Sequence, residues 1–501
     1  MRLNSSTLAA MESSVRRPAY DREALTIGMA HLGVGAFHRC HQAEFTDDML
    51  EQRFGPWGVL GINLRPPRLE PVLGPQDGLY TRNLHQDGAE PERRVIGCIR
   101  AVMDAQTDLE RSLDALADPR IGVVTMTVTE KGYCHVPATG ALDDTNADIL
   151  HDLAHPHNPK SLPGFLIAAL ERRRAQAGGP LTLISCDNIP SNGAILHRVV
   201  TALAQQRSRD LGTWIEDHVA FPSTMVDRIV PATTKAEAAR ITAAIGLDDQ
   251  ACVVGEPFRQ WVIEDRFAGG RPPWDLAGAT ITADVTGHEL IKMRVLNGAQ
   301  SSFCTLGAII GLDFTFEDAR HPVLERIVRR MLEDETATTL PAVTGMQVGA
   351  YIDLSLTRLR NSAIRHTNHQ IATDGSQKIM QRLLNPMRDR LRQGQSFDKL
   401  ACAVAGFIVY LAKASPKFGA LWTPSDPFAA AVRGIADEVG AAIEPLVRRV
   451  LALSAIFGHD LPSALGVVEI ITRHVAGLLS PDPLGYLREL ANGCRGAVRR
   501  V

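Results

Sequence analysis

The first half of the chain alternates short apolar runs with helix-like stretches, and no other feature constrains the fold as much. The runs at 121–128 and 181–185 are apolar and rich in β-branched residues, as expected of strands buried on both faces. Helical patterns lie between such runs, for example at 108–117 and 164–177. This alternation predicts an α/β fold with a doubly wound, mostly parallel sheet of the Rossmann type.

Three more strands are predicted before residue 100, at 24–32, 58–64 and 94–99. From about residue 286 the pattern changes to long stretches with helical apolar spacing, and prolines mark many of their ends. These stretches cover 289–306, 321–332, 398–412, 429–457 and 465–479. We therefore expect a polar lead-in over 1–22, a Rossmann-type dinucleotide-binding domain over 23–285 and a mainly α-helical C-terminal domain over 286–501.

Charge and composition exclude several classes of partner. The 501 residues include 53 Lys plus Arg and 56 Asp plus Glu, a net charge of -3. This balance lacks the positive field of a nucleic-acid-binding protein and gives no polybasic membrane contact. No stretch approaches the roughly 18 to 20 apolar residues of a membrane span, and the N-terminus lacks the apolar core of a secretory signal.

The eight cysteines are scattered through the chain without a Cys-x-x-Cys pair, which is typical of reduced thiols in a protein of this length. The two closely spaced histidine pairs, at 38 and 41 and at 366 and 369, lack an acidic neighbour in a known zinc spacing. We therefore expect a soluble cytoplasmic protein with no metal, no nucleic-acid partner and no membrane contact.

A glycine-rich turn follows the first predicted strand and opens a predicted helix. Gly33 would permit the tight turn, and Gly35 would let the backbone approach a pyrophosphate at the helix N-terminus. The third glycine of the dinucleotide fingerprint would fall at His38, so the match is incomplete. An ordinary glycine-rich connection between strand and helix is the alternative.

The residue that reads the cofactor ribose should follow the second strand, about 20 residues or more beyond the glycines. This chain has Asn63 and Arg65 where an aspartate is expected. An arginine there would accept the 2′-phosphate of NADP or would be a solvated loop charge. We expect NAD as cofactor, and the sequence leaves NADP open.

A polar group of residues interrupts the apolar stretch that begins the C-terminal domain. At about 100° per residue, Glu289, Lys292, Asn297 and Gln300 fall within an arc of roughly 140° on a helix. A desolvated lysine can act as a general base, and amide donors can polarise a carbonyl. An ordinary helix with a solvated Glu–Lys pair fits the same pattern.

Several ordered motifs together resemble one enzyme family. They comprise residues 32–39 with His41 and Gln42, 127–133, 185–188 with Asn192 and Gly193, 221–228, and Lys292 followed by Asn297 and Gly298. In this order they resemble the polyol-specific long-chain dehydrogenases, which include mannitol 2-dehydrogenase and fructuronate reductase. The resemblance runs from about residue 25 to at least residue 385, and the helical C-terminal domain suits the family's substrate and catalytic domain.

The resemblance implies the catalytic roles. Lys292 would exchange a proton with the reacting secondary alcohol, and Asn188 and Asn297 would hydrogen-bond the same oxygen. Glu289, one helical turn before the lysine, matches a carboxylate associated with proton passage to solvent. Hydride would pass directly between a nicotinamide and the sugar carbon without a metal.

The resemblance also implies binding residues. Asp227 and Lys378 match substrate-pocket positions. The positions expected beside the cofactor are Gly33, Gly35 and Phe37, with Thr129, Glu130 and Lys131 on the nicotinamide side. Many relatives are monomeric, so we expect a monomer or a small homo-oligomer.

One position departs from the family pattern. The family usually has histidine three residues after the helix asparagine, where this chain has Gln300. Glutamine can hydrogen-bond a sugar hydroxyl but does not titrate near neutral pH. The alternative to an active oxidoreductase is therefore a catalytically weak nucleotide-binding sensor or scaffold with the same fold.

The segment from residue 360 to 378 bears on the substrate. Mannitol dehydrogenases tend to have arginine at the position of Gln370, so this segment is more similar to the fructuronate-reductase branch. Arg365 and Lys378 could hold a carboxylate through charge-assisted bonds, or the arginine could be a solvated helix-end charge. We expect a sugar acid or a polyol as substrate and favour the sugar acid.

Overall fold

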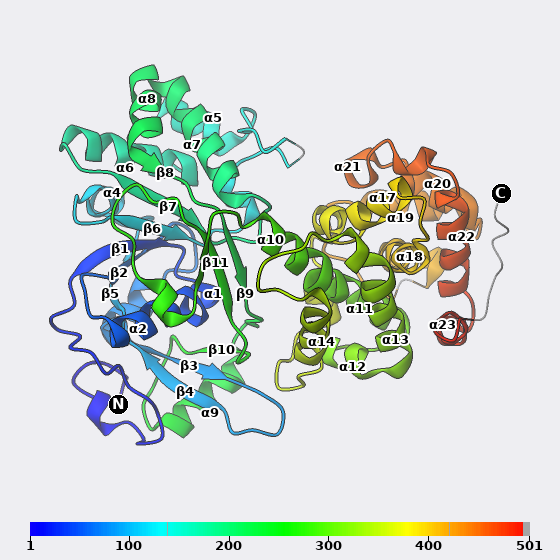
Figure 1. The fold of residues 1–501 in the computed structure, drawn as a ribbon, viewed down its shortest axis with the longest axis horizontal. Coiled ribbons are helices and arrows are strands. Elements are labelled where there is room, and N and C mark those ends of the chain that lie inside the picture. The colour runs from blue at the N-terminus through cyan, green and yellow to red at the C-terminus, as the bar shows by residue number, and fades with distance from the viewer. Residues whose placement is uncertain (138, 420, 494–501) are drawn as a thin grey trace. The chain divides into compact units, whose positions relative to one another are not determined.

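The computed structural model describes residues 1–137, 139–419 and 421–493, and Figure 1 shows its course. The chain forms two compact units, Met1–Thr286 and Gly287–Val501. The first combines sheets with helices, and the described part of the second is built from helices and short turns. The cysteine at position 494 lies outside the described residues, and the seven described cysteines are buried and form no disulfide.

The first unit is organised around a six-stranded sheet in which every pair is parallel. Its strands are β1 (Ile27–Leu32), β2 (Gly58–Asn63), β5 (Ile99–Asp104), β6 (Val123–Met126), β7 (Leu181–Ser185) and β8 (Val219–Ala220). The spatial order is β5-β2-β1-β6-β7-β8, so the third strand of this sheet lies at one edge and the sixth at the other. This is the order of a doubly wound dinucleotide-binding sheet, which confirms the predicted Rossmann-type fold.

Successive residues of these strands enter two different hydrophobic cores. Leu32 and Met126 belong to a core that includes residues of α4 (Leu109–Ala117), α6 (Leu162–Ala175) and α7 (Asn192–Arg207). Met29 and Val123 belong to the opposite core, which includes residues of α2 (Gln42–Gln52). Figure 1 shows these helix groups on the two sides of the sheet. Burial on both faces explains why the strands are continuously apolar.

The predicted strand at 94–99 does not belong to the parallel sheet. Residues 92–96 form β4 (Glu92–Ile96), which pairs antiparallel with β3 (Tyr80–Leu84) in a separate sheet that also contains β10 (Val253–Gly255). The third strand of the main sheet is instead β5, after a break at Gly97 and Cys98. Because β5 is an edge strand with partly exposed residues, it lacks the continuous apolar pattern that identifies its neighbours.

A third sheet completes the strands of this unit. It contains β9 (Thr224–Asp227), β11 (Gln260–Glu264) and β12 (Thr280–Thr282), with β11 at its centre. The remaining α-helices of the unit are α1 (Ala36–Cys40), α3 (Glu70–Leu73), α5 (Ala147–Ala154), α8 (Arg209–His218) and α9 (Lys235–Ile245).

The first 22 residues, expected to be a polar lead-in, bury several apolar side chains. Leu3, Met11 and Val15 are buried in a small cluster with Ile241 and Ile245 of α9. The backbone N–H of Leu3 donates to the Asp248 carbonyl at 2.9 Å. This segment therefore packs as part of the first unit, through apolar residues too widely spaced to form a sequence pattern.

The second unit is helical, which confirms the prediction for the C-terminal domain. Its first helices are α10 (Thr286–Lys292), α11 (Gly298–Ile309), α12 (Thr315–Arg320), α13 (Pro322–Arg330), α14 (Val348–Leu359), α15 (Asn368–Ala372) and α16 (Gly375–Ile379). The others are α17 (Asn385–Arg392), α18 (Asp398–Ala412), α19 (Ala429–Val439), α20 (Ile443–Leu451), α21 (Ser454–Phe457), α22 (Val467–Leu478) and α23 (Pro483–Ala491). The apolar α18 is almost fully buried and packs against α11 and α22.

Two predicted helical stretches are interrupted. Residues 429–457 form α19, α20 and α21, with Gly440 at a φ of 59° after the first of them. Residues 289–306 contain a π-helical segment, η5 (Met293–Asn297), between α10 and α11. Two further π segments, η6 (Met331–Thr336) and η8 (Met380–Leu384), pack against η5.

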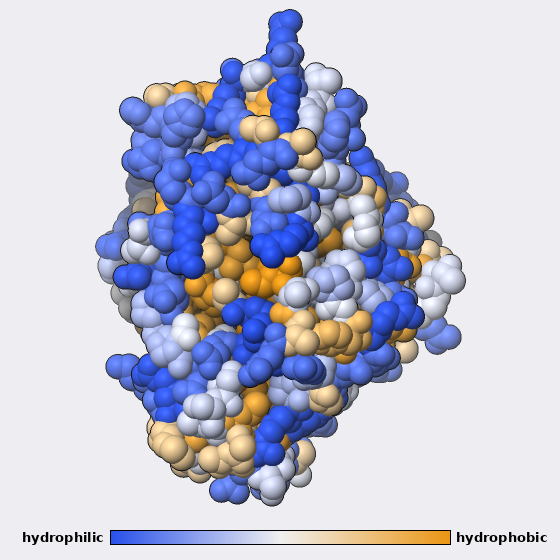
Figure 2. All heavy atoms as spheres, turned by 90° about the vertical axis from the view of Figure 1, so that its left-hand side faces the viewer, coloured by the Kyte–Doolittle hydropathy of each residue, from blue (hydrophilic) through white to orange (hydrophobic). Residues whose placement is uncertain are grey.

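In Figure 2 the visible face is largely hydrophilic, and hydrophobic residues gather near its centre. Within residues 1–137, 139–419 and 421–493, no helix combines the length and apolar content needed to cross a membrane.

Candidate active site

The glycine turn lies at the carboxyl end of β1, beside the point where the chain order of the sheet reverses. Gly33 has a φ of 86°, and a Cβ there would lie 2.2 Å from the Thr127 carbonyl oxygen. Gly35 is exposed, and a Cβ there would meet nothing nearer than the Gly33 oxygen at 3.9 Å. The fold therefore requires glycine at Gly33, whereas at Gly35 glycine leaves open the approach to the first backbone turn of α1.

His38 occupies the place of the third fingerprint glycine and packs on His31 of β1. The His38 ring stacks on the His31 ring with centroids 3.4 Å apart, and both residues are buried. Burial lowers the pKa of His31 to about 3 and lowers the pKa of His38, so both rings are neutral near pH 7. Flat stacking of two neutral rings lets α1 pack on β1 without a glycine. Phe37, half-buried on the same helix, stacks on His41.

Asn63 and Arg65 lie in the loop after β2. The Asn63 side-chain amide donates to the Arg65 carbonyl at 2.8 Å and to the Pro67 carbonyl at 2.6 Å, which fixes the loop. Arg65 is largely exposed and forms an ion pair with Asp148 at 2.5 Å. The N–H of Gly33 donates to the Ile62 carbonyl, so the loop begins beside the glycine turn. This is where a Rossmann fold reads the cofactor ribose.

A strained turn follows β6 and carries Thr129, Glu130 and Lys131. Thr129 has φ 68° and ψ 159°, a conformation that glycine adopts readily and other residues rarely do. The Asp187 carboxylate accepts the backbone N–H groups of Val128 at 2.9 Å and Thr129 at 3.0 Å. Sequence reasoning did not select Asp187, although it lies in the 185–188 motif.

The loop after β7 carries Asn188, which is half-buried. Asn192 anchors this loop, because its side-chain amide donates to the carbonyls of Ser185 and Thr224 at 3.1 and 3.0 Å. Thr224 begins β9, and the buried Asp227 ends it. The first unit thus connects the Thr129 turn, the Asn188 loop and the strand of Asp227 through hydrogen bonds.

In the second unit the π segment changes the spacing of the polar residues. Lys292 ends α10 and is 7% exposed, and Asn297 ends the π segment and is 3% exposed. An uninterrupted α-helix would place residues five apart about 140° from each other. A π segment, with its i→i+5 hydrogen bonds, brings the fifth residue closer to the position above the first. The π segment therefore brings Lys292 and Asn297 closer to the same face of the helix than an α-helix would. Glu289, before the lysine, and Gln300, after the asparagine, are half-buried.

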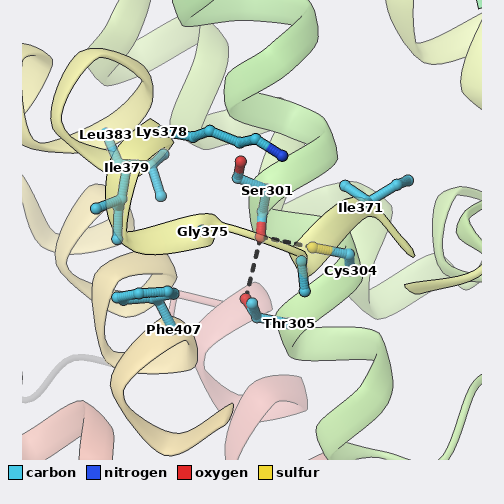
Figure 3. Close-up of a pocket in the computed structure, with 10 residues that line it drawn as sticks. Ser301, Cys304, Thr305, Ile371, Gly375, Lys378, Ile379, Leu383 and Phe407 are labelled. Atoms are coloured by element: carbon cyan, nitrogen blue, oxygen red, sulfur yellow. Dashed lines mark hydrogen bonds between the residues drawn. The ribbon is translucent and has the colours of Figure 1, made fainter. Parts of the chain in front are cut away.

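A small pocket lies one turn further along α11. Ser301, Cys304 and Thr305 line it from α11, and Lys378 and Phe407 come from α16 and α18 (Figure 3). Figure 3 shows the Lys378 side chain reaching toward Ser301. Its Nζ donates to the Thr373 carbonyl at 2.6 Å.

Arg382 is a cation near this pocket that sequence reasoning missed. It lies in η8, is 8% exposed, and its guanidinium donates to the Ser301 hydroxyl at 3.0 Å. Burial raises the pKa of the Cys304 thiol to about 12, and the charges of Arg382 and Lys378 partly oppose that rise. An arginine inside an apolar π segment has no spacing signal in the sequence.

Two predicted substrate residues do not line the pocket. Arg365 is exposed, with its guanidinium 4.3 Å from the ring centre of Phe314. The exposed Gln370 accepts the Thr367 backbone N–H in a capping box that starts α15. Among the described residues, no group of three His, Cys, Asp or Glu side chains is arranged to hold a metal ion.

The chain matches two family models. Residues 27–276 match the mannitol dehydrogenase Rossmann domain, and residues 284–479 match the mannitol dehydrogenase C-terminal domain. The D-mannonate oxidoreductase of Escherichia coli strain K12 is 40% identical over 463 residues, covering 91% of this chain and 94% of that protein. The mannitol 2-dehydrogenase of Cereibacter sphaeroides is 38% identical over 387 residues, covering 77% and 80%.

A solved structure is similar over the same extent. The ternary complex of Pseudomonas fluorescens mannitol 2-dehydrogenase with NAD and D-mannitol has a TM-score of 0.89 and 34% identity. The match covers 98% of this chain and 100% of that one. These matches, together with the sheet order and the ordered motifs, show that this chain belongs to the mannitol dehydrogenase family.

Proposed function

We propose that this protein is an NAD-dependent oxidoreductase, with NADP as the alternative cofactor, that acts on a secondary alcohol or ketone of a sugar acid or polyol. The observation that carries the proposal is the pair of buried residues Lys292 and Asn297, drawn toward one helix face by a π segment. Residues 23–285 would bind the dinucleotide, and residues 286–501 would carry the substrate and the proton-transfer groups. The protein would work in the cytoplasm as a monomer or small homo-oligomer.

The residues of the first unit fit a dinucleotide. Gly35 leaves the start of α1 open, so the pyrophosphate would approach its backbone there, beside Gly33 and Phe37. Asn63 and Arg65 lie where the ribose is read, and the exposed arginine is the group that would decide between NAD and NADP. Thr129, Glu130 and Lys131 would face the nicotinamide end. When bound, the nicotinamide supplies or accepts the hydride.

The protein's own groups would handle the proton. In the direction of oxidation, the Nζ of the buried Lys292 would accept the hydroxyl proton. The side-chain amides of Asn188 and Asn297 stabilise the negative charge that develops on the same oxygen. Glu289, three residues before the lysine, would carry the proton to solvent. In reduction the same groups work in reverse.

For the substrate we propose a sugar acid of the D-mannonate/D-fructuronate type, with D-mannitol/D-fructose as the alternative pair. The relative named D-mannonate oxidoreductase supports the acid, and so does Lys378 at the pocket next to Gln300. Asp227 would hold a hydroxyl. Arg365 and Gln370 would contact the substrate from exposed positions.

The test is the loss of reduced-nicotinamide absorbance with NADH and NADPH in turn, on D-fructose, D-fructuronate and D-tagaturonate. Turnover of a keto acid but not of fructose supports the sugar acid, and turnover of fructose alone supports the polyol. Cofactor binding without turnover of any of the three would favour the catalytically weak sensor or scaffold that Gln300 suggests. In that case Gln300→His tests whether an imidazole restores activity.

A further inference from the structure

A single half-buried residue, Asp187, joins two loops of the first unit through its carboxylate. Asp187, directly before Asn188, accepts the N–H of Val128 and the N–H of Thr129 with different oxygens. The Tyr133 hydroxyl donates to it at 2.7 Å and lies 2.5 Å from the Ser185 hydroxyl. Asp187 therefore connects the turn after β6 with the loop after β7.

The turn that Asp187 holds has an unfavourable backbone conformation. Thr129 is the first residue of this turn, and its φ of 68° with ψ of 159° lies in a region that is nearly restricted to glycine. Its β-branched side chain makes the conformation harder to adopt. Such a conformation persists only where the surroundings enforce it, and two N–H bonds to one carboxylate are an interaction of that kind.

We propose that Asp187 is a positioning residue: it holds the Thr129–Lys131 turn in the conformation that receives the nicotinamide end of the dinucleotide, and it fixes this turn relative to Asn188. The inference rests on the proposed function, because it assumes a dinucleotide as the ligand of the turn. Asp187 itself need not touch the ligand, since it acts through the backbone of its neighbours.

The charge of the carboxylate is central to this role. An ionised carboxylate accepts all three hydrogen bonds, whereas a protonated one turns an acceptor oxygen into a donor that faces an N–H or O–H group. Burial raises the pKa of Asp187 to about 6, and its hydrogen bonds and the nearby Glu130 charge modify this value. The other titratable groups facing it are Tyr133 and Cys186, and burial raises the pKa of each so far that neither ionises near neutral pH.

The first experiment compares Asp187→Asn with Asp152→Asn. Asp152 is the control, because its carboxylate also accepts two backbone N–H groups in the same unit, those of Lys160 and Ser161 at 2.7 and 2.9 Å. The readouts are the Kd for NADH by fluorescence, without substrate, and thermal unfolding. We expect Asp187→Asn to raise this Kd about tenfold, the effect of weakening a hydrogen bond to a charged group. Asp152→Asn should lower stability and leave the Kd unchanged.

The outcomes separate this inference from the proposed function. If the wild-type protein does not bind NADH or NADPH, the proposed function fails. If the wild-type protein binds and Asp187→Asn binds equally well, the positioning role fails. Equal weakening by Asp187→Asn and Asp152→Asn would also overturn it, because that result indicates general loss of structure.

A rescue experiment tests the mechanism. Thr129→Gly removes the conformational strain, so the turn no longer needs the carboxylate to hold it. In the Asp187→Asn background this second change should recover most of the lost NADH affinity. If the double variant binds no better than Asp187→Asn alone, Asp187 does not act through the backbone of Thr129.

The pH dependence of NAD binding by the wild-type protein gives a test that does not depend on the folding of an Asp187 variant. The Kd for NAD, measured by calorimetry from roughly pH 5 to pH 8, should rise as the pH falls through the carboxyl pKa of about 6. Glu130→Gln should move this transition to lower pH, because it removes a negative charge that raises the pKa of Asp187. A flat wild-type profile across this range would overturn the proposal.

Discussion

The candidate groups of the two units stand on different kinds of backbone. In the first unit they lie on loops after strands, and each loop is held by side chains such as Asp187 and Asn192. In the second unit Lys292, Asn297 and Gln300 lie on one continuous helical run, whose geometry is set by the backbone ladder and its π segment. The residues on the loops are therefore positioned by a few side-chain hydrogen bonds. The residues on the helix are positioned by the register of its backbone hydrogen bonds.

The largest expected effect lies on the helix. Lys292→Met keeps the length of the side chain and removes the proposed proton acceptor, so turnover should fall about a hundredfold to ten-thousandfold, the range for losing a general base. The Kd for NADH should stay nearly unchanged, and steady-state kinetics with fluorescence titration measures both. Equal loss of turnover and of NADH affinity would indicate a structural role for Lys292.

The two asparagines test the difference between the units, because Asn188 lies on a loop and Asn297 lies on the helical run. Asn188→Ala and Asn297→Ala should each slow the chemical step by about a hundredfold, as when one donor to an oxyanion is removed. Single-turnover kinetics checks the step. Asn192→Ala should also lower turnover, together with stability, because it releases the loop that carries Asn188. A normal rate in Asn297→Ala would exclude an oxyanion role for the helix amide.

The two glycines of the turn after β1 should respond differently. Gly33→Ala should destabilise the first unit by about 1 to 3 kcal/mol, because its φ is 86° and the Thr127 oxygen occupies the Cβ position. Gly35→Ala should leave thermal stability unchanged and raise the Kd for NADH about tenfold, since the added methyl group blocks only a ligand. Unchanged NADH binding in Gly35→Ala would contradict the proposed pyrophosphate site.

The last effect leaves turnover unchanged and is a pH dependence of stability in the second unit. Asp318 of α12 is buried and accepts one hydrogen bond from Asn368 at 3.2 Å, and burial raises its pKa to about 8. The folded protein therefore keeps a proton that the unfolded chain releases near pH 4. This contribution to stability is complete below about pH 4 and is lost as the pH rises toward 8.

Asp318→Asn should remove this pH slope, and urea unfolding at several pH values measures it. Asp187, with three donors against the one of Asp318, has its pKa raised only to about 6, so its slope should end at lower pH. The same slope in wild type and Asp318→Asn would contradict the assignment.

Periodicity and local motifs determined the fold class of both units. The strands β1, β2, β6 and β7 are apolar on both faces, and this pattern predicts a parallel sheet covered by helices without any knowledge of pairing. The glycine turn and the Lys292–Asn297 run were visible for a similar reason: their chemistry depends on residue types at short spacing.

Only the tertiary structure decided features that depend on hydrogen-bond register or on residues far apart in sequence. No local sequence pattern identifies the edge strand β5, the π segment that ends at Asn297 or the contact between Arg382 and Ser301. The hydrogen bonds that Asp187 accepts from Val128 and Thr129 span 59 and 58 positions, and the His31–His38 stack depends on how α1 packs on β1. A local pattern records which face of an element is buried, whereas these contacts are set by where separate elements meet.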